Sequence, residues 1–169
     1  QLTEALKIGI NANLNAPKNK INNVVITGLG GSGIGGKIAT QLVANQMQIP
    51  AVINNDYRLP LFVNENTLVI ISSFSGNTEE TLYALEACQK RRTQIACVTS
   101  GGALEKLAKE KGFNCITIPD GQPPRAMFGY SFTQLFFLLN HYGLIDNSFM
   151  SEFEKGISLL DSQEEAIKS

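Results

Sequence analysis

The sequence predicts an α/β fold: one doubly wound domain whose five-stranded parallel sheet is flanked by helices on both faces. Two observations lead to this fold class. Short runs rich in β-branched and apolar residues, which suit strands buried on both faces of a parallel sheet, alternate along the chain with helix-like segments. Such alternation implies βαβ units, and right-handed crossovers between them place helices on both faces.

Taken in order, the elements begin with a helix at residues 1–14, where Leu2, Leu6 and Ile10 recur four apart on one face. Strands are expected at 24–27, 51–54, 68–71, 95–98 and 115–118. The other helices are expected at 34–46, 79–90, 103–111, about 126–141 and about 148–168. The chain therefore divides into an N-terminal helix and linker (1–21), one α/β domain (22–146) and a C-terminal helix (147–169).

Bulk composition disfavours several classes of function. Hydrophobic residues make up 43% of the chain and charged residues 17%, which is ordinary for a soluble globular protein. A net charge of −1 supplies no broad basic field for nucleic acid or a membrane surface, and no apolar run reaches the roughly 18 residues of a transmembrane helix. The three cysteines form no C-x-x-C pair, and with no signal-peptide pattern they indicate a reduced, cytoplasmic setting.

A glycine-rich turn at Gly28–Gly33 follows the first strand, and its sequence admits several ligands. It fits the dinucleotide pattern G-x-G-x-x-G, which also needs an acidic residue after the second strand; Asp56 is available there but lies late. The same segment approaches a P-loop, but Ile38 lacks the hydroxyl that would bind Mg²⁺. The surroundings of Ser32 and Ser75 both depart from the nucleophile elbow G-x-S-x-G, which disfavours a serine hydrolase.

The remaining interpretation of this turn is a phosphate cradle. Glycines let backbone N–H groups point at an anion, and the dipole of the following helix favours negative charge there. Ser32 adds a hydroxyl donor. Gly35 and Gly36 continue the pattern into the helix at a cost of about 0.5–1 kcal/mol each relative to Ala, and we expect close backbone approach to compensate.

A second turn, at residues 72–81, decides between these interpretations. It follows the third strand and carries four hydroxyls within residues 72–78, just before a helix. Helix capping by Thr78 explains one of them, whereas Ser73 and Ser75 together suit a phosphate held from several sides. A dinucleotide site does not require this second turn, so the sequence predicts a small ligand with one phosphate.

The two turns are expected at one edge of the sheet. In open parallel sheets, ligands bind at the carboxyl ends of the strands, near the point where the strand order reverses. The turns after the first, third and fourth strands lie there, and so does the Pro-Pro-Arg segment at 123–125. Because the residue before a proline is held extended, we expect this loop to present Arg125 rigidly to the ligand.

These loops resemble a known family. The sequences Gly-Leu-Gly-Gly-Ser-Gly at 28–33 and Ser-Phe-Ser-Gly-Asn-Thr-Glu-Glu-Thr at 73–81 resemble the sugar isomerase (SIS) domain, over about residues 22–142. Thr-Ser-Gly-Gly at 99–102 and Gly-Gln-Pro-Pro-Arg at 121–125 are similar to the bifunctional phosphoglucose/phosphomannose isomerases. The resemblance implies a flavodoxin-like three-layer sandwich that binds a hexose 6-phosphate, with no metal or organic cofactor.

The resemblance also implies roles for individual residues. It places the phosphate on Gly31, Ser32, Ser73, Ser75 and Thr78. It implies that Arg125 faces the sugar and stabilises negative charge on an enediolate. The implied reaction interconverts fructose 6-phosphate with glucose 6-phosphate, mannose 6-phosphate or both.

Family members of this type carry two SIS domains in one chain. The implied glutamate base and the histidine that opens the sugar ring lie in the second half. This chain starts at Gln1 and ends in a charged helical stretch, so we expect a piece of a longer protein that is inactive alone. His141 is expected to be a partly buried helix residue and not the ring opener.

Two other functions stay open. SIS domains also act as sugar-phosphate sensors in regulators, although no basic helix-turn-helix segment is visible here. Other SIS enzymes, such as an amidotransferase or sedoheptulose-phosphate isomerase, are disfavoured by the Pro-Pro-Arg loop. We expect homodimerisation, or pairing with a second SIS domain, through the apolar helix around Phe132, Leu135, Phe136 and Leu139.

Overall fold

The computed structural model describes residues 1–28 and 30–163, and these contain a parallel sheet of five strands. The strands are β1 (Asn23–Thr27), β2 (Ala51–Asn54), β3 (Thr67–Ser72), β4 (Gln94–Thr99) and β5 (Asn114–Thr117). They lie in the order β2-β1-β3-β4-β5, and all neighbouring pairs are parallel. The expected fold class is confirmed, and each strand lies within one residue of its predicted bounds.

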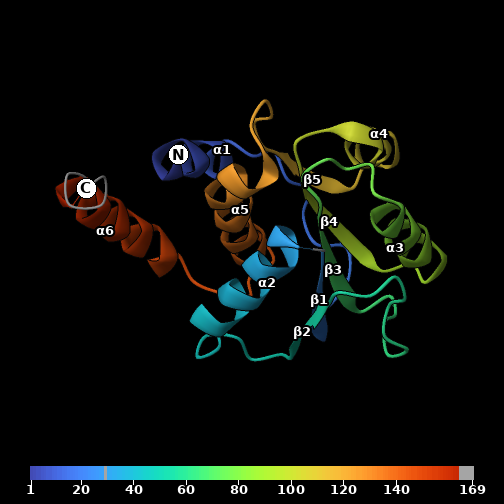
Figure 1. Cartoon of the computed structure of the whole chain (residues 1–169). Coiled ribbons are helices and arrows are strands. Elements are labelled where there is room, and N and C mark those ends of the chain that lie inside the picture. Colours follow the sequence, from blue (N-terminus) through green and yellow to red (C-terminus); the bar gives the residue numbers. More distant parts are fainter. Residues whose placement is uncertain (29, 164–169) are drawn as a thin grey trace.

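Helices cover both faces of the sheet (Figure 1). One face carries α1 (Leu2–Ile10), α2 (Gly31–Leu42), α5 (Phe128–His141) and, outside these, α6 (Ser148–Ser162); the other carries α3 (Glu79–Lys90) and α4 (Gly102–Lys111). A 3-10 turn, η1 (Pro124–Met127), precedes α5. The predicted continuation of the last helix over 164–168 lies outside the described residues. No helix in the described part of the chain is both long and apolar enough to cross a bilayer.

Successive residues of the central strands point to opposite faces of the sheet. Val24 and Ile26 of β1 belong to the core beneath α5, while Val25 belongs to the core beneath α3 and α4. β3 is buried along its whole length. This burial on two sides explains why the strand sequences are apolar without alternation.

The chain reverses its direction across the sheet after β2. β1 pairs with β2 on one side and with β3 on the other, so β1 and β3 are neighbours although β2 separates them in the sequence. α2 then lies on one face and α3 on the other (Figure 1). The turns after β1 and β3 therefore open side by side at the carboxyl edge, where folds of this class bind ligands.

Two helices differ from their predicted bounds. α1 ends at Ile10 and not near residue 14, because the side-chain amide of Asn11 donates to the carbonyl oxygen of Lys7 and closes the helix. α2 starts at Gly31, three residues before the predicted start at 34, and ends at Leu42, four residues before the predicted end at 46. Its early start follows from Gly30, whose φ of 56° turns the backbone sharply from the strand into the helix.

The prediction that α5 provides an exposed surface for pairing with another copy or domain is wrong. Leu135, Phe136 and Leu139 are only 1%, 4% and 0% exposed, because α5 packs on the sheet and is covered by α1, α2 and α6. Only Phe132 of that group is half-buried. α5 is apolar on most sides because it is the central helix of its layer, as is typical of a buried helix.

α2 approaches β1 closely at Gly36. A Cβ atom at this position would lie 2.9 Å from Cγ2 of Ile26, a fully buried side chain. A Cβ at Gly35 would instead lie 3.5 Å from Phe128, which is ordinary contact. The expected close approach is therefore confirmed at Gly36 and is absent at Gly35.

We predict that Gly36→Ala destabilises the protein by about 1–3 kcal/mol, because the stiff β-branched Ile26 cannot move aside in a packed core. Gly156→Ala is the matched control, since among the described residues nothing beyond its own helix turn lies within 4 Å of the Cβ position of this helical glycine. That alanine should stabilise the protein by about 0.5–1 kcal/mol. Urea unfolding measures both, and two effects of the same sign would contradict the close packing of α2 on β1.

Candidate functional site

A pocket of about 560 Å³ opens at the carboxyl edge of the sheet. Three segments form it: the turn between β1 and α2, the turn between β3 and α3, and the segment from η1 into α5. The residues that line it are Gly30, Gly31, Ser32, Ile34, Ser72, Ser73, Phe74, Ser75, Thr78, Thr81, Pro124, Arg125, Phe128 and Ser131. The edge predicted to bind the ligand is therefore hollowed where the strand order reverses.

This pocket brings together all the residues predicted from the sequence as a binding site. They are Gly31, Ser32, Ser73, Ser75, Thr78 and Arg125. Ser73 is buried, Ser32 is half-buried, and Ser75 and Thr78 are exposed. Hydroxyl groups therefore line the pocket from its buried floor to its open rim.

The glycine turn after β1 is packed against the hydroxyl turn after β3. A Cβ atom at Gly28 would lie 2.7 Å from the carbonyl oxygen of Ser72 and 2.9 Å from Cβ of Ser32, so only glycine lets the two turns meet. Gly30 is the N-cap residue of α2 and has no side chain to cap it. The amides of the first turn of α2 therefore stay available to an anion, which the helix dipole also favours.

The hydroxyl turn, residues 73–78, is anchored at its start and carries a hydroxyl at its end. The N–H of Ser73 donates to the carbonyl oxygen of Val98 at 3.0 Å, which ties the turn to β4. Thr78 is the N-cap residue of α3, as expected, but its side chain makes no capping bond. Its hydroxyl pairs instead with that of Thr81 at 2.6 Å, and both lie in the pocket lining.

Arg125 supplies a positive charge to the pocket lining. It lies in η1, after Pro123, whose ψ of 143° is the extended conformation expected before a second proline. Arg125 is exposed, and within the described residues it forms no salt bridge. Its positively charged guanidinium is therefore available to an anionic ligand.

Besides Ser72 at the end of β3, two polar residues of the lining were not predicted as site residues from the sequence. Thr81 lies in the first turn of α3, and Ser131 lies in the first turn of α5. Residues three apart share one face of a helix. Thr81 follows Thr78 by three residues, and Ser131 follows Phe128 by three, each at the start of a helix at this edge of the sheet. This spacing is the signal that could have identified Thr81 and Ser131 from the sequence.

The described residues that line the pocket include no carboxylate and no imidazole. His141 is half-buried at the end of α5, and its Nε2 lies 2.7 Å from the carbonyl oxygen of Asn15; it is the partly buried helix residue that was expected. Glu80 lies just beyond the hydroxyl turn and accepts a hydrogen bond from the Tyr57 hydroxyl at 2.6 Å. That hydrogen bond lowers the pKa of the Glu80 carboxyl, which makes it a weaker general base.

The acidic residue considered for dinucleotide binding lies outside the pocket. Oδ1 of Asp56 accepts the backbone N–H of Arg58 at 3.3 Å, and Asp56 is not part of the lining. Asn55, next to it, lies against the glycine turn, where its Oδ1 is 2.6 Å from the Cβ position of Gly33. The lining thus offers amides and hydroxyls to an anion but no carboxylate to a ribose.

Comparisons with known proteins identify the family. The SIS domain family model matches residues 19–141. The chain is 47% identical over 146 residues to a bifunctional phosphoglucose/phosphomannose isomerase of Caldicellulosiruptor bescii, covering 86% of this chain and 43% of that protein. It is 37% identical over 150 residues to a protein of the same name from Thermoplasma volcanium, covering 86% and 45%. The chain belongs to the SIS domain family.

A solved structure shares the fold. A protein of Clostridium difficile 630, provisionally described as a phosphosugar isomerase, superposes with a TM-score of 0.75 at 21% identity and covers 98% of this chain and 50% of that chain. The chain spans less than half the length of the two curated relatives above. Proteins of that length have room for a second domain of this size.

Gly76 provides a test of the turn geometry. Its φ is 64°, and a Cβ there would collide with the carbonyl oxygen of Gly101. We predict that Gly76→Ala lowers Tm, because overpacking typically costs about 1–3 kcal/mol of folding free energy. The added methyl group should also displace the hydroxyl turn and so weaken binding of inorganic phosphate by about tenfold or more.

Gly121→Ala is the matched control, because its φ of 86° is equally unfavourable for alanine but its Cβ position is open. It should cost about 1–2 kcal/mol of stability and leave phosphate binding unchanged. Thermal unfolding and calorimetric titration with inorganic phosphate measure the two effects. Equal phosphate affinities in the two variants would show that the contact with Gly101 does not shape the pocket.

Proposed function

We propose that this chain is the phosphosugar-binding domain of an aldose–ketose isomerase that interconverts fructose 6-phosphate with glucose 6-phosphate, mannose 6-phosphate or both. The observation that carries the proposal is the pocket, in which a helix N-terminus, a row of hydroxyls and an arginine face the same space. The names of the two curated relatives, both phosphoglucose/phosphomannose isomerases, support the same choice of substrate.

In this proposal the phosphate binds between the two turns. The backbone amides of Gly31 and Ser32 meet it from α2, whose N-terminus carries the equivalent of about half a positive charge. Ser73, Ser75 and Thr78 donate hydroxyl hydrogen bonds from the other side, and bonds to a charged group contribute about 1.5–3 kcal/mol each. A chain with a net charge of −1 can hold a dianion in this way because the donors are local.

Arg125 is proposed to act on the sugar. It lines the pocket from η1, a segment separate from both phosphate-binding turns. Isomerisation moves a proton between C1 and C2 through an enediol, and negative charge develops on the sugar oxygens. A guanidinium that is always protonated stabilises this charge in the transition state.

The general base is proposed to lie in the remainder of a longer protein. The described lining residues include no carboxylate, so residues 22–146 hold the substrate while a second SIS domain supplies the groups that transfer protons. Residues 1–21 and 147–169 flank this binding domain. The chain alone then binds the sugar phosphate without turning it over. We also propose a cytoplasmic setting, in keeping with three cysteines that are free thiols.

We propose that the second domain docks on the outer face of α2. Ile34, Ile38 and Leu42 recur four apart on this helix and are 58%, 38% and 62% exposed, and exposed apolar stripes of this kind mark interaction surfaces. Ile34 also lines the pocket. Since the chain spans less than half of its curated relatives, a second domain of the same polypeptide is the partner that fits. From this stripe it reaches the pocket rim, where the missing base is needed.

The proposed function is tested with the full-length protein, which should interconvert fructose 6-phosphate with glucose 6-phosphate or mannose 6-phosphate, while residues 1–169 should show no turnover. Arg125→Ala should lower kcat by about 10²–10³-fold while changing the Ki of inorganic phosphate by less than about threefold, because the arginine acts on the sugar. Coupled enzyme assays measure both constants.

Arg58→Ala is the control for this experiment, since Arg58 is an exposed arginine outside the pocket lining. It should leave kcat and the phosphate Ki unchanged. The proposed function is rejected if the full-length protein interconverts neither pair of hexose phosphates. Loss of phosphate affinity in Arg125→Ala would instead place Arg125 on the phosphate.

The docking surface is tested by replacing Ile38 and Leu42 together with Asp. This change should lower the Tm of the full-length protein by several degrees, since burying a carboxylate without a partner costs several kcal/mol. The same change in residues 1–169 should have little effect, because both side chains are exposed there. Leu61→Asp, at a position 96% exposed after β2, is the control. Equal shifts in both lengths would place the docking surface elsewhere.

A further inference from the structure

The hydroxyl turn is held from outside the pocket by the segment that joins β4 to α4 and by the first turn of α4. The carbonyl oxygen of Phe74 accepts two hydrogen bonds from Ser100, one from its N–H at 2.9 Å and one from its hydroxyl at 2.7 Å. The carbonyl oxygen of Gly76 accepts the N–H of Leu104 at 3.0 Å. These bonds fix the backbone of the turn at two of its central residues.

Asn77 adds a side-chain bond from the same turn to α4. Its Oδ1 accepts the backbone N–H of Ala103 at 2.8 Å. The N-cap residue of α4 is Gly101, which has no side chain, so a residue 26 positions from Ala103 in the sequence caps the helix. Replacing a capping side chain by Ala leaves a helix N–H without its partner and destabilises the helix.

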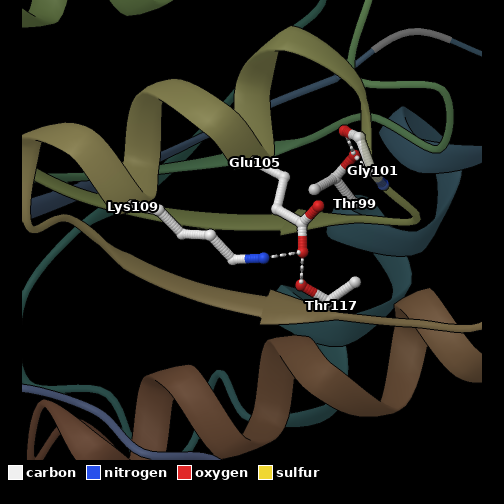
Figure 2. Close-up of polar contacts among 5 residues, drawn as sticks. All are labelled: Thr99, Gly101, Glu105, Lys109 and Thr117. Carbon is white, nitrogen blue, oxygen red and sulfur yellow. Dashed lines mark hydrogen bonds and ion pairs between the residues drawn. The ribbon is translucent and has the colours of Figure 1, made fainter.

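α4 is itself anchored to the sheet independently of this turn. Oε1 of Glu105 accepts hydrogen bonds from the Thr117 hydroxyl at 2.8 Å and from Nζ of Lys109 at 2.7 Å, which joins the first turn of α4 to the end of β5 (Figure 2). The bond from Lys109, followed by that from Thr117, lowers the pKa of the Glu105 carboxyl. The carboxylate therefore stays ionised at neutral pH, and α4 forms a fixed support for the cap.

The surroundings of Asn77 leave the turn little freedom. A Cβ atom at Gly102 would lie 2.7 Å from Oδ1 of Asn77 and would collide with the carbonyl oxygen of Ser75. The N–H of Asn77 donates to Oγ of Ser75 at 3.3 Å. Asn77 does not line the pocket, whereas Ser75 and Thr78 on either side of it do. A shift of Asn77 is therefore transmitted to hydroxyls that face the pocket.

We propose that Asn77 is a positioning residue of the phosphate site: by capping α4 it holds the hydroxyl turn in the geometry that presents Ser75 and Thr78 to the phosphate. This inference rests on the proposed function of the pocket. It also explains where two N–H groups of the first turn of α4 find acceptors: those of Ala103 and Leu104 donate to the hydroxyl turn. The N-terminus of α4 therefore stabilises the turn, while that of α2 stays available to the ligand.

The test uses the full-length protein with Asn77→Ala and Asn77→Asp. Asn77→Ala should raise the KM for fructose 6-phosphate and the Ki of inorganic phosphate together by about tenfold, the effect of one weakened hydrogen bond to a charged group, with kcat within about twofold. Asn77→Asp keeps the accepting oxygen. It should lie within about threefold of the unchanged protein when both are measured at the same high ionic strength, which screens the added charge.

Asn147→Ala is the matched control, because Asn147 is the N-cap residue of α6 and its side chain makes no capping bond. It should leave both constants unchanged. The inference is overturned if Asn77→Ala also leaves the KM and the phosphate Ki unchanged. It is overturned too if Asn77→Asp fails to restore these constants although its thermal unfolding curve shows that the variant is folded. A lower kcat with an unchanged phosphate Ki overturns it as well, since Asn77 would then act on the chemistry.

Stabilisation by inorganic phosphate separates this inference from the proposed function. A ligand that binds the folded state raises Tm, so the rise in Tm with phosphate reports binding without turnover. If phosphate stabilises the full-length protein but no isomerisation occurs, the proposed function fails. The inference is then decided by Tm alone: a weaker phosphate effect in Asn77→Ala than in Asn147→Ala supports it, and equal effects overturn it.

Discussion

The pocket depends on one packing constraint: the carboxyl ends of β1 and β3 are neighbours in the sheet. The two strands pair from Asn23 to Thr27 of β1, so the turns after them begin side by side. Gly28 then closes the gap, because no Cβ atom fits between it and the carbonyl oxygen of Ser72. A side chain at this position would push the two turns apart. The strand order and the lack of a side chain at Gly28 together set the geometry available to a ligand.

Two helices that begin at this edge use their N-termini differently. The first-turn amides of α2 follow a glycine N-cap and open toward the pocket. Those of α4 also follow a glycine N-cap, but the carbonyl oxygen of Gly76 and the side chain of Asn77 occupy them. The N-terminus of α2 is thus available to an anion, while the N-terminus of α4 binds the turn that carries the hydroxyls. The sequence of both N-caps is glycine, so local sequence does not distinguish the two uses.

Apolar helices in this fold also have two different roles. α5 is apolar on most sides because the sheet and three helices surround it, and Leu135 and Leu139 are 1% and 0% exposed. α2 instead leaves Ile34, Ile38 and Leu42 at the surface beside the pocket. Hydrophobicity alone therefore favoured the wrong helix as a docking surface. An exposed stripe on an otherwise packed helix is the stronger indication of a missing partner.

The sequence by itself determined the strands, the two turns, and the residues Ser32, Ser75 and Arg125 that meet in the pocket. Apolar runs and glycine- or hydroxyl-rich turns are local patterns, and in a parallel sheet the turns that follow the strands share one edge. Only the tertiary structure decided that Asn77 caps α4, that Thr81 completes the lining, and that α5 is buried while α2 keeps an apolar stripe exposed. Each of these depends on which elements become neighbours, and that long-range property is not contained in the spacing of residues along the chain.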